Sequence, residues 1–197
     1  AEEGLEDILP KIPGNVLIVT PTDAVPPILP NDVTLIAEGD PNGKKEWDKI
    51  RKTAHGVRLW AHYGGLMLRD FTFKRKDLMA VILVGIPYPN MNDPKIKAKQ
   101  VYLDRLADDV GTVTIRDGKG HAIEKPCVRF EEWKQSYASR LVHESLFAGM
   151  RSRYDACAFI FLDTRFEALI KRQEFRPWFK KNLLYFPTIE SMKLPLD

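Results

Sequence analysis

Short apolar runs alternate along this chain with stretches of helical periodicity. Apolar runs of this length indicate strands, and regular alternation with helices indicates a parallel sheet covered by helices on both faces. The strand-like runs lie near residues 15–20, 33–37, 57–62, 79–85 and 157–162, and the helical patterns near 43–55, 93–108, 130–152 and 164–183. The pattern therefore predicts an α/β fold.

The clearest local signal is the fourth apolar run and the segment after it. Ala80–Gly85 is an apolar run of strand length, and Pro87 and Pro89 favour an extended path for the chain that follows. Asp93 then supplies a helix N-cap, and Pro94 suits the first helical position. Strand, rigid loop and helix together indicate one step of a parallel α/β sheet.

Aromatic residues recur at helical spacing near the middle of the chain. Phe130, Trp133, Tyr137 and Leu141 follow one another at intervals of three and four residues. This periodicity places them on one helix face, so we expect a stripe that faces the core in preference to a surface on which bases stack.

A β-hairpin is predicted between two of the helices. Residues 113–123 alternate in polarity about Asp117-Gly118, a pair typical of hairpin turns. Arg116, Lys119 and His121 lie near the tip, where they are within reach of a phosphate backbone if one binds there. A solvated turn explains the same residues and is the favoured interpretation.

Composition agrees with one compact domain over residues 1–197. The chain has 197 residues, is 44% hydrophobic and 29% charged, and carries a modest net charge of +3. Its two cysteines lack metal-ligand spacing, which favours a reducing compartment, cytoplasmic or nuclear, over secretion. No apolar stretch approaches the roughly 18 residues of a membrane span, and no signal sequence is apparent. Histidine spacing predicts no metal site.

An ordered series of residues carries a family resemblance. The series is Gly85-Ile86-Pro87-Tyr88-Pro89-Asn90, Asp93-Pro94 and Tyr102-Leu103-Asp104, with further similarity at residues 14–22 and 158–166. It resembles the second RecA-like domain of the XPD and DinG-like superfamily 2 DNA helicases over roughly residues 13 to 170, and leaves a C-terminal helix and tail at 164–197. The resemblance implies a RecA-like, P-loop NTPase-type sheet.

The ATP-binding motifs of such helicases are missing from this chain. It contains neither Gly-x-x-x-x-Gly-Lys-Ser/Thr nor Asp-Glu-x-His, so we expect no ATPase activity from the chain alone and no catalytic residue. ATP and magnesium would be cofactors only if a partner domain completed the site.

Two motifs of the family's second domain also differ here. Its Gln-x-x-Gly-Arg-x-x-Arg helix matches Glu144–Arg151, where only Arg151 remains as a possible arginine finger against a partner's phosphate, a surface arginine being the favoured interpretation. The family's segment that couples nucleotide binding to DNA matches residues 64–73. Here Arg69 replaces an acid, Asp70 a glycine and Thr72 an aspartate, so the original hydrogen-bonding role is not kept.

Candidate nucleic-acid contacts come from basic residues and from loops that follow strands. In the family the second domain grips a single strand through such loops, by hydroxyls and amides that hold phosphates without reading sequence. The candidates are Thr20, Thr22, Tyr63, Arg69, Lys95, Lys97, Lys99, Arg116 and Lys119.

Three functions remain open from sequence. The leading hypothesis is a non-catalytic helicase-derived domain that binds nucleic acid, with single-stranded DNA favoured, or docks in a replication, repair or transcription assembly. The alternative is the second half of an ATP-dependent helicase whose phosphate-binding-loop domain lies on another chain. The third is a protein-interaction scaffold that uses aromatic residues near Trp178, Phe179, Tyr185 and Phe186. A membrane partner is not expected.

Overall fold

The computed structural model describes two compact groups of residues. The described positions are 3–21, 34–51, 56–74, 77–150, 155–171 and 177–184, with Phe175, Phe186, Thr188 and Ser191. One unit comprises residues 1–87 and 140–197, and the other comprises residues 88–139. The single domain expected over residues 1–197 stays a prediction, and the two units are described separately.

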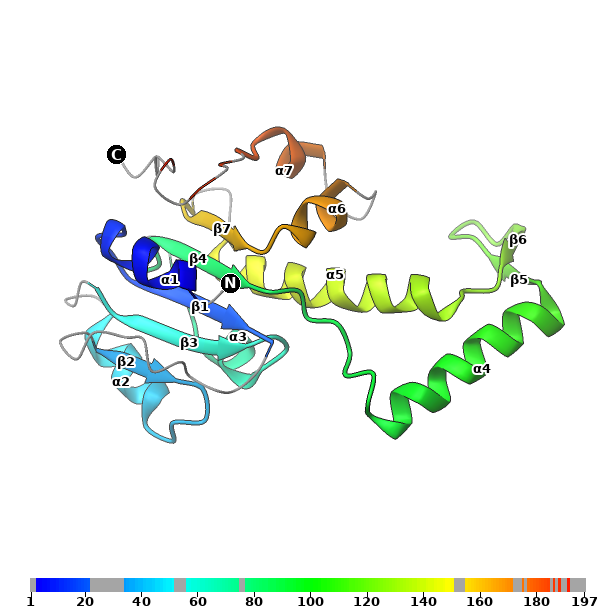
Figure 1. Ribbon diagram of the computed structural model, residues 1–197, viewed down its shortest axis with the longest axis horizontal. Helices are drawn as coiled ribbons and strands as arrows, with labels where there is room; N and C mark the ends of the chain where they lie inside the picture. Colours follow the sequence, from blue (N-terminus) through cyan, green and yellow to red (C-terminus); the bar gives the residue numbers. More distant parts are fainter. Residues whose placement is uncertain are drawn as a thin grey trace. The chain divides into compact units, whose positions relative to one another are not determined.

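The first unit is built on a parallel five-stranded sheet. Its strands are β1 (Val16–Thr20), β2 (Leu35–Ala37), β3 (Arg58–His62), β4 (Ala80–Val84) and β7 (Ala158–Leu162), in the order β2-β3-β1-β4-β7 (Figure 1). Every neighbouring pair is parallel, with Ile18 opposite both Trp60 and Ile82. The central strands β1 and β4 are buried throughout, which explains why they read as continuous apolar runs. All five predicted strands are confirmed.

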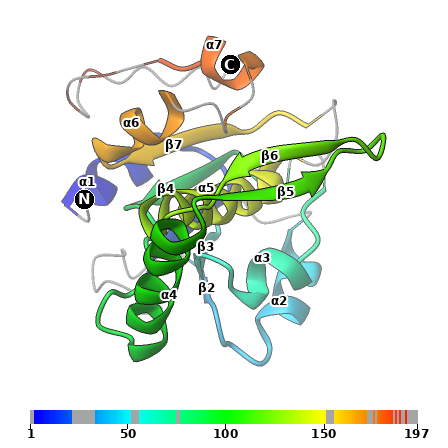
Figure 2. The same cartoon turned by 90° about the vertical axis from the view of Figure 1, so that its right-hand side faces the viewer.

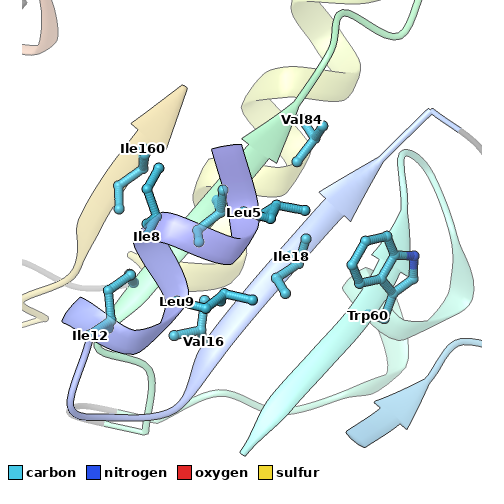
Figure 3. Close-up of a cluster of buried hydrophobic side chains, with 11 residues drawn as sticks. Leu5, Ile8, Leu9, Ile12, Val16, Ile18, Trp60, Val84 and Ile160 are labelled. Atoms are coloured by element: carbon cyan, nitrogen blue, oxygen red, sulfur yellow. The ribbon is translucent and has the colours of Figure 1, made fainter. Parts of the chain in front are cut away.

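An N-terminal helix that the periodicity did not predict covers one face of this sheet. It comprises α1 (Glu3–Ile8) and the 3₁₀ turn η1 (Leu9–Lys11). Leu5, Ile8 and Leu9 point from it toward the sheet, over Val16 and its neighbours on β3, β4 and β7 (Figure 3). Six residues are too few to show an amphipathic repeat, so packing on the sheet holds this helix in place.

A buried arginine ties this N-terminal segment to β3. The Arg58 guanidinium donates hydrogen bonds to the carbonyl oxygens of Gly14 at 2.6 Å, Leu9 at 3.1 Å and Ile12 at 3.3 Å. Leu9 is the first residue of η1, and Ile12 and Gly14 lie just beyond its end, where backbone carbonyls take partners from outside the helix. Burial lowers the pKa of Arg58 from its ordinary value, because it removes water from the charged group.

The other face of the sheet packs against helices from later in the chain. These are α2 (Gly43–Ile50), α3 (Leu66–Asp70), the end of α5 (Phe130–Gly149), α6 (Arg165–Lys171) and α7 (Pro177–Lys181). Gly149 approaches Val81 so closely that a Cβ there would lie 2.8 Å from a valine methyl. The helix expected over 164–183 is wrong as one element, since α6 and α7 are separate and Pro177 begins the second.

Phenylalanine side chains hold the last two helices on this face. Phe161 of β7 makes edge contacts with Phe166 of α6 and Phe179 of α7, with ring centroids 4.9 and 5.9 Å apart. Phe179 is therefore part of the core. This agrees with a C-terminal helix packed on its own domain, so Phe179 does not contribute to the docking face of the scaffold hypothesis. The side chains of Trp178 and Tyr185 lie outside the described residues.

The second unit contains a long helix, a hairpin and the first half of α5. Helix α4 (Pro94–Val110) begins as the sequence predicts, with the Asp93 side chain accepting a hydrogen bond from the backbone nitrogen of Lys95 at 2.8 Å. The strands β5 (Thr112–Arg116) and β6 (Ala122–Pro126) follow it as an antiparallel ribbon (Figure 2). The predicted hairpin is confirmed, and all ten strand residues are exposed.

The aromatic stripe on α5 is only partly a core feature. Phe130 and Leu141 are buried, as expected, but Trp133 and Tyr137 remain half-buried. Helical periodicity correctly placed these residues on one side of the helix. It did not show how much of each ring the neighbouring elements cover, which depends on tertiary packing.

No described helix is both long and apolar enough to cross a membrane.

Candidate nucleic-acid interface

The carboxyl ends of β1, β3 and β4 meet where the chain order reverses in the sheet. From β1 the chain builds β2 and β3 on one side and then crosses to β4 on the other. In open parallel sheets this switch point leaves a crevice in which ligands commonly bind. Thr20, Tyr63 and Gly85 lie there, at or just after the three strand ends.

Tyr63 fills part of this switch point. Its backbone nitrogen donates to the Thr20 carbonyl oxygen at 3.0 Å, and its hydroxyl donates to the Gly85 carbonyl oxygen at 2.9 Å. The side chain is 7% exposed, and burial, together with the nearby Asp163 carboxylate, raises its pKa well above the ordinary value. The phenol is therefore neutral and engaged inside the protein, and Thr20 is buried beside it.

Asp163 and Arg165 form a charged pair just after β7. The Asp163 carboxylate accepts hydrogen bonds from the Arg165 backbone nitrogen at 2.8 Å and from its Nη2 at 2.6 Å. Hydrogen bonding to the Arg165 side chain is the main cause of the lowered pKa of Asp163. Both charges are thus engaged locally at this edge of the sheet.

Glu38 organises the turn after β3, a role that the sequence analysis missed. Its carboxylate accepts hydrogen bonds from the backbone nitrogens of His62 at 2.9 Å and Met67 at 3.1 Å, and lies 3.2 Å from His62 Nδ1. Gly65 passes so close that an added Cβ would overlap the carboxylate oxygens. The adjacent glycine pair Gly64-Gly65 was the available sequence signal, since consecutive glycines indicate close backbone approach.

The residues matched to the coupling segment lie on or just after α3. Arg69 and Asp70 are exposed at the end of this helix, and Thr72 is exposed two residues beyond. The Thr72 carbonyl oxygen accepts a hydrogen bond from Trp47 Nε1 at 3.5 Å. Arg69 is therefore positioned at the surface of the first unit, with its guanidinium accessible to an anion.

The matched arginine helix is the last part of α5. Phe147 occupies the position of the family's glycine and is 63% exposed, whereas Ala148 occupies that of the first arginine and is 3% exposed. Arg151, matched to the last arginine, and Thr22, a candidate phosphate contact, lie outside the described residues.

Lys95, Lys97 and Lys99 lie on the first half of α4, with Lys95 and Lys99 on the same helix face. All three are exposed, and among the described residues none has an ion-pair partner. Residues 94–103 contain these three lysines and no acidic residue. The acids of α4 lie further along, where Asp108 pairs with Arg129 at 2.8 Å and Asp109 with Arg105 at 3.2 Å.

The predicted contacts in the hairpin lie around a loop held by Asp117. Its carboxylate accepts hydrogen bonds from the backbone nitrogens of Lys119 and His121, both at 2.8 Å. The His121 backbone hydrogen bond is the main cause of the lowered pKa of Asp117. Arg116 donates to the Gly120 carbonyl oxygen at 3.3 Å, so Lys119 is the more available cation at this exposed tip.

The predicted candidates thus divide between the two units. Thr20 and Tyr63 come together at the switch point of the first unit, with their side chains buried, while Arg69 is exposed on α3. The remaining described candidates, Lys95, Lys97, Lys99, Arg116 and Lys119, belong to the second unit. Within the described part of the chain, no group of three or more metal-ligating side chains comes together.

Comparison with known proteins places these features in a family. The family model described as "Helicase C-terminal domain" matches residues 5–182. A regulator of telomere elongation helicase 1 homolog from Caenorhabditis elegans is 27% identical over 151 residues, which cover 73% of this chain and 14% of that protein. The regulator of telomere elongation helicase 1 of Mus musculus is 31% identical over 130 residues, which cover 66% of this chain and 10% of that protein. The chain therefore spans only a small part of these relatives.

A solved structure independently supports the fold. The structure of S. tokodaii Xpd4 superposes with a TM-score of 0.60 at 16% sequence identity, covering 88% of this chain and 31% of that one. At this identity the likeness concerns the fold alone, and it confirms the RecA-like α/β architecture expected from the sequence resemblance. Because the family model extends over most of its length, the chain belongs to the helicase C-terminal domain family.

Proposed function

We propose that this chain binds single-stranded nucleic acid through the first half of α4 and does not hydrolyse ATP by itself. The observation that carries the proposal is the set of three exposed lysines, Lys95, Lys97 and Lys99, on the first turns of that helix. The partial positive charge of a helix N-terminus disfavours cations there by a few tenths of a kcal/mol each. The helix dipole therefore gives no reason for these lysines, whereas attraction to phosphates does.

The distribution of acids along α4 sharpens this argument. Asp104 accepts a hydrogen bond from the Phe130 backbone nitrogen at 3.1 Å, and the two later acids of the helix pair with arginines. The negative charges are thus engaged in the second half of α4, and the positive potential of the first half is left for a ligand. Phosphate binding by such a surface releases counterions and does not depend on base sequence.

The absence of ATPase activity is supported by the motif positions. The chain lacks the phosphate-binding loop, and buried Ala148 stands where the family has its first motor arginine. An alanine cannot donate to a developing phosphate charge as a guanidinium does. ATP and magnesium would bind here only as part of a site completed by another domain.

Anisotropy titration of a labelled 20-nucleotide oligothymidine, at several salt concentrations, tests nucleic-acid binding. Reversing Lys95, Lys97 and Lys99 to glutamate is expected to weaken binding and to reduce the salt slope by about 2, because each lost phosphate contact on a single strand contributes about 0.7. The matched control reverses Lys44, Lys45 and Lys49, three exposed lysines of α2 in the first unit. Equal losses for both variants would assign the binding to overall charge and refute a specific role of α4.

The length of the relatives favours a second candidate function. Because the chain corresponds to only 10–14% of those helicases, it can act as the second motor domain of an ATP-dependent helicase with a phosphate-binding-loop domain supplied separately. Arg151 is then the candidate arginine finger. DNA-stimulated ATPase activity that appears only when such a domain is added, and that falls when Arg151 is changed to alanine, would support this function over the non-catalytic one.

A further inference from the structure

Trp133 lies in a row of aromatic rings at the surface of the second unit. Its ring centroid is 5.4 Å from that of Phe130 and 5.4 Å from that of Tyr137, one turn away on either side along α5. Phe130 is buried, whereas Trp133 and Tyr137 are only half-buried. The row therefore passes from the interior of this unit to its surface, and part of the indole remains accessible.

A lysine of the proposed binding surface lies directly over this indole. The Lys99 ammonium is 4.3 Å from the centroid of the Trp133 ring, a cation–π contact. Lys99 is exposed and Trp133 is half-buried, so this contact is at the surface of the second unit. An exposed cation–π contact is weak, and another flat or charged group can replace the ammonium on the ring.

A second aromatic ring in this unit is also associated with a lysine. The Lys134 ammonium is 5.5 Å from the Tyr88 ring centroid, and the Tyr88 hydroxyl donates to Gln135 Oε1 at 3.2 Å. Gln135 is itself buried and donates to Glu131 at 2.8 Å, which fixes the orientation of the tyrosine. Aromatic rings held in place and bordered by lysines are the elements with which proteins bind single strands without sequence preference.

We propose that a base of the bound single strand stacks on the Trp133 indole, while Lys99 leaves the ring and contacts the adjacent phosphate. The proposal rests on the function proposed above and adds to it the contact that distinguishes a nucleic acid from any other polyanion. The aromatic face accepts any base, because every base presents a π-surface. Lys95, four residues before Lys99 on the same helix face, then holds a neighbouring phosphate.

Packing alone is the competing explanation of the same aromatic row. Base stacking and packing predict different effects on the binding of a ligand without bases. An aromatic residue used only for packing affects stability and not the choice of ligand. A stacking residue affects binding of a strand that carries bases, and leaves binding of the same backbone without bases unchanged. The choice of ligand therefore separates the two explanations.

The test compares labelled 20-nucleotide oligothymidine with an abasic 20-mer of the same phosphate backbone. The full chain is titrated as wild type, as Trp133→Leu and as Trp133→Phe, with thermal unfolding recorded for each protein. Trp133→Leu is expected to weaken oligothymidine binding about tenfold, which corresponds to the loss of one stacked base, and to change abasic binding less than about twofold. Trp133→Phe keeps an aromatic face and is expected to recover most of the affinity.

Phe147→Leu is the matched control, because it removes an aromatic ring that is 63% exposed but lies in the first unit. It is expected to change neither titration. Equal weakening of both ligands by Trp133→Leu, or no weakening of either, would overturn stacking while leaving nucleic-acid binding intact. If wild type binds neither ligand at low salt, the proposed function fails and the stacking inference fails with it.

Discussion

The Tyr63 hydroxyl donates a hydrogen bond of 2.9 Å to the carbonyl oxygen of Gly85, across the end of the strand that separates β3 from β4. Gly85 has a φ of +68°, a conformation that favours glycine, and a Cβ there would lie 3.2 Å from the Pro21 ring. The end of β1 is thus enclosed by residues from both neighbouring strands. The switch point is stabilised by contacts within the protein, whereas the exposed basic candidates lie on other elements, Arg69 on α3 and the rest on α4 and the hairpin.

Removing the Tyr63 hydroxyl should destabilise the first unit. Tyr63→Phe leaves the buried carbonyl of Gly85 without this donor, so we expect a loss of about 1–2 kcal/mol in the free energy of unfolding. Urea denaturation followed by circular dichroism measures it. Tyr102→Phe is the control, since Tyr102 is 63% exposed and should change stability by less than about 0.5 kcal/mol. Equal effects of the two substitutions would show that the Tyr63 hydroxyl bond contributes nothing.

Gly65→Ala should disrupt the turn that Glu38 organises. The backbone of Gly65 has a φ of −71°, which alanine adopts readily, so only the overlap of the new Cβ with the Glu38 carboxylate matters. We expect a loss of about 1–3 kcal/mol, as for other overpacked sites. Gly118→Ala, in the open hairpin loop, is the control and should be nearly neutral.

A double-mutant cycle identifies the cause of that loss. In a Glu38→Ala background the carboxylate is gone, and Gly65→Ala should then cost much less than in the wild type. An unchanged cost in that background would mean that Glu38 is not the group that excludes a side chain at position 65.

Arg58→Leu should release the N-terminal helix. The buried carbonyl oxygens of Ile12 and Gly14 lose the Arg58 donor, whereas that of Leu9 keeps its bond from the Ile12 backbone nitrogen. We expect a loss of about 3 kcal/mol in stability. Hydrogen exchange should show the largest loss of protection in α1 and η1. Arg105→Leu provides the comparison, because that side chain is 80% exposed and pairs only at the surface. Unchanged hydrogen exchange in α1 and η1 would show that Arg58 does not hold the N-terminal segment in place.

Asp163 should contribute stability that depends on pH. Its pKa is lowered in the folded protein by Arg165, so its ionised form is favoured by folding. The contribution is fully present above the ordinary carboxyl pKa of about 3.9 and is lost as the pH falls through the lowered value. Asp163→Asn should therefore reduce stability at pH 7, and the difference from wild type should shrink below about pH 4. A difference that stays constant down to pH 2 would exclude this ionisation as its source.

Local sequence determined much of the fold. The apolar runs at β1 and β4 are continuous because both strands are buried on two faces, and Asp93-Pro94 marks the start of α4 through its own capping chemistry. Asp117-Gly118 likewise placed the hairpin. Each of these signals is contained within a few consecutive residues, so no knowledge of distant partners is needed to interpret it.

The candidate site depended on contacts between residues far apart in the chain. Sequence supplied Lys99 and Trp133 as separate features, one a candidate nucleic-acid contact and the other a core-facing aromatic. Only the packing of α4 against α5 in the second unit brings the ammonium over the ring. In the same way, Tyr63 was expected to face a ligand, but the strand order turns its hydroxyl toward Gly85. Residue type and periodicity determine which surfaces can be buried. Which side chains meet there is decided by the order of the strands and the crossing of the helices, because those place distant segments at contact distance.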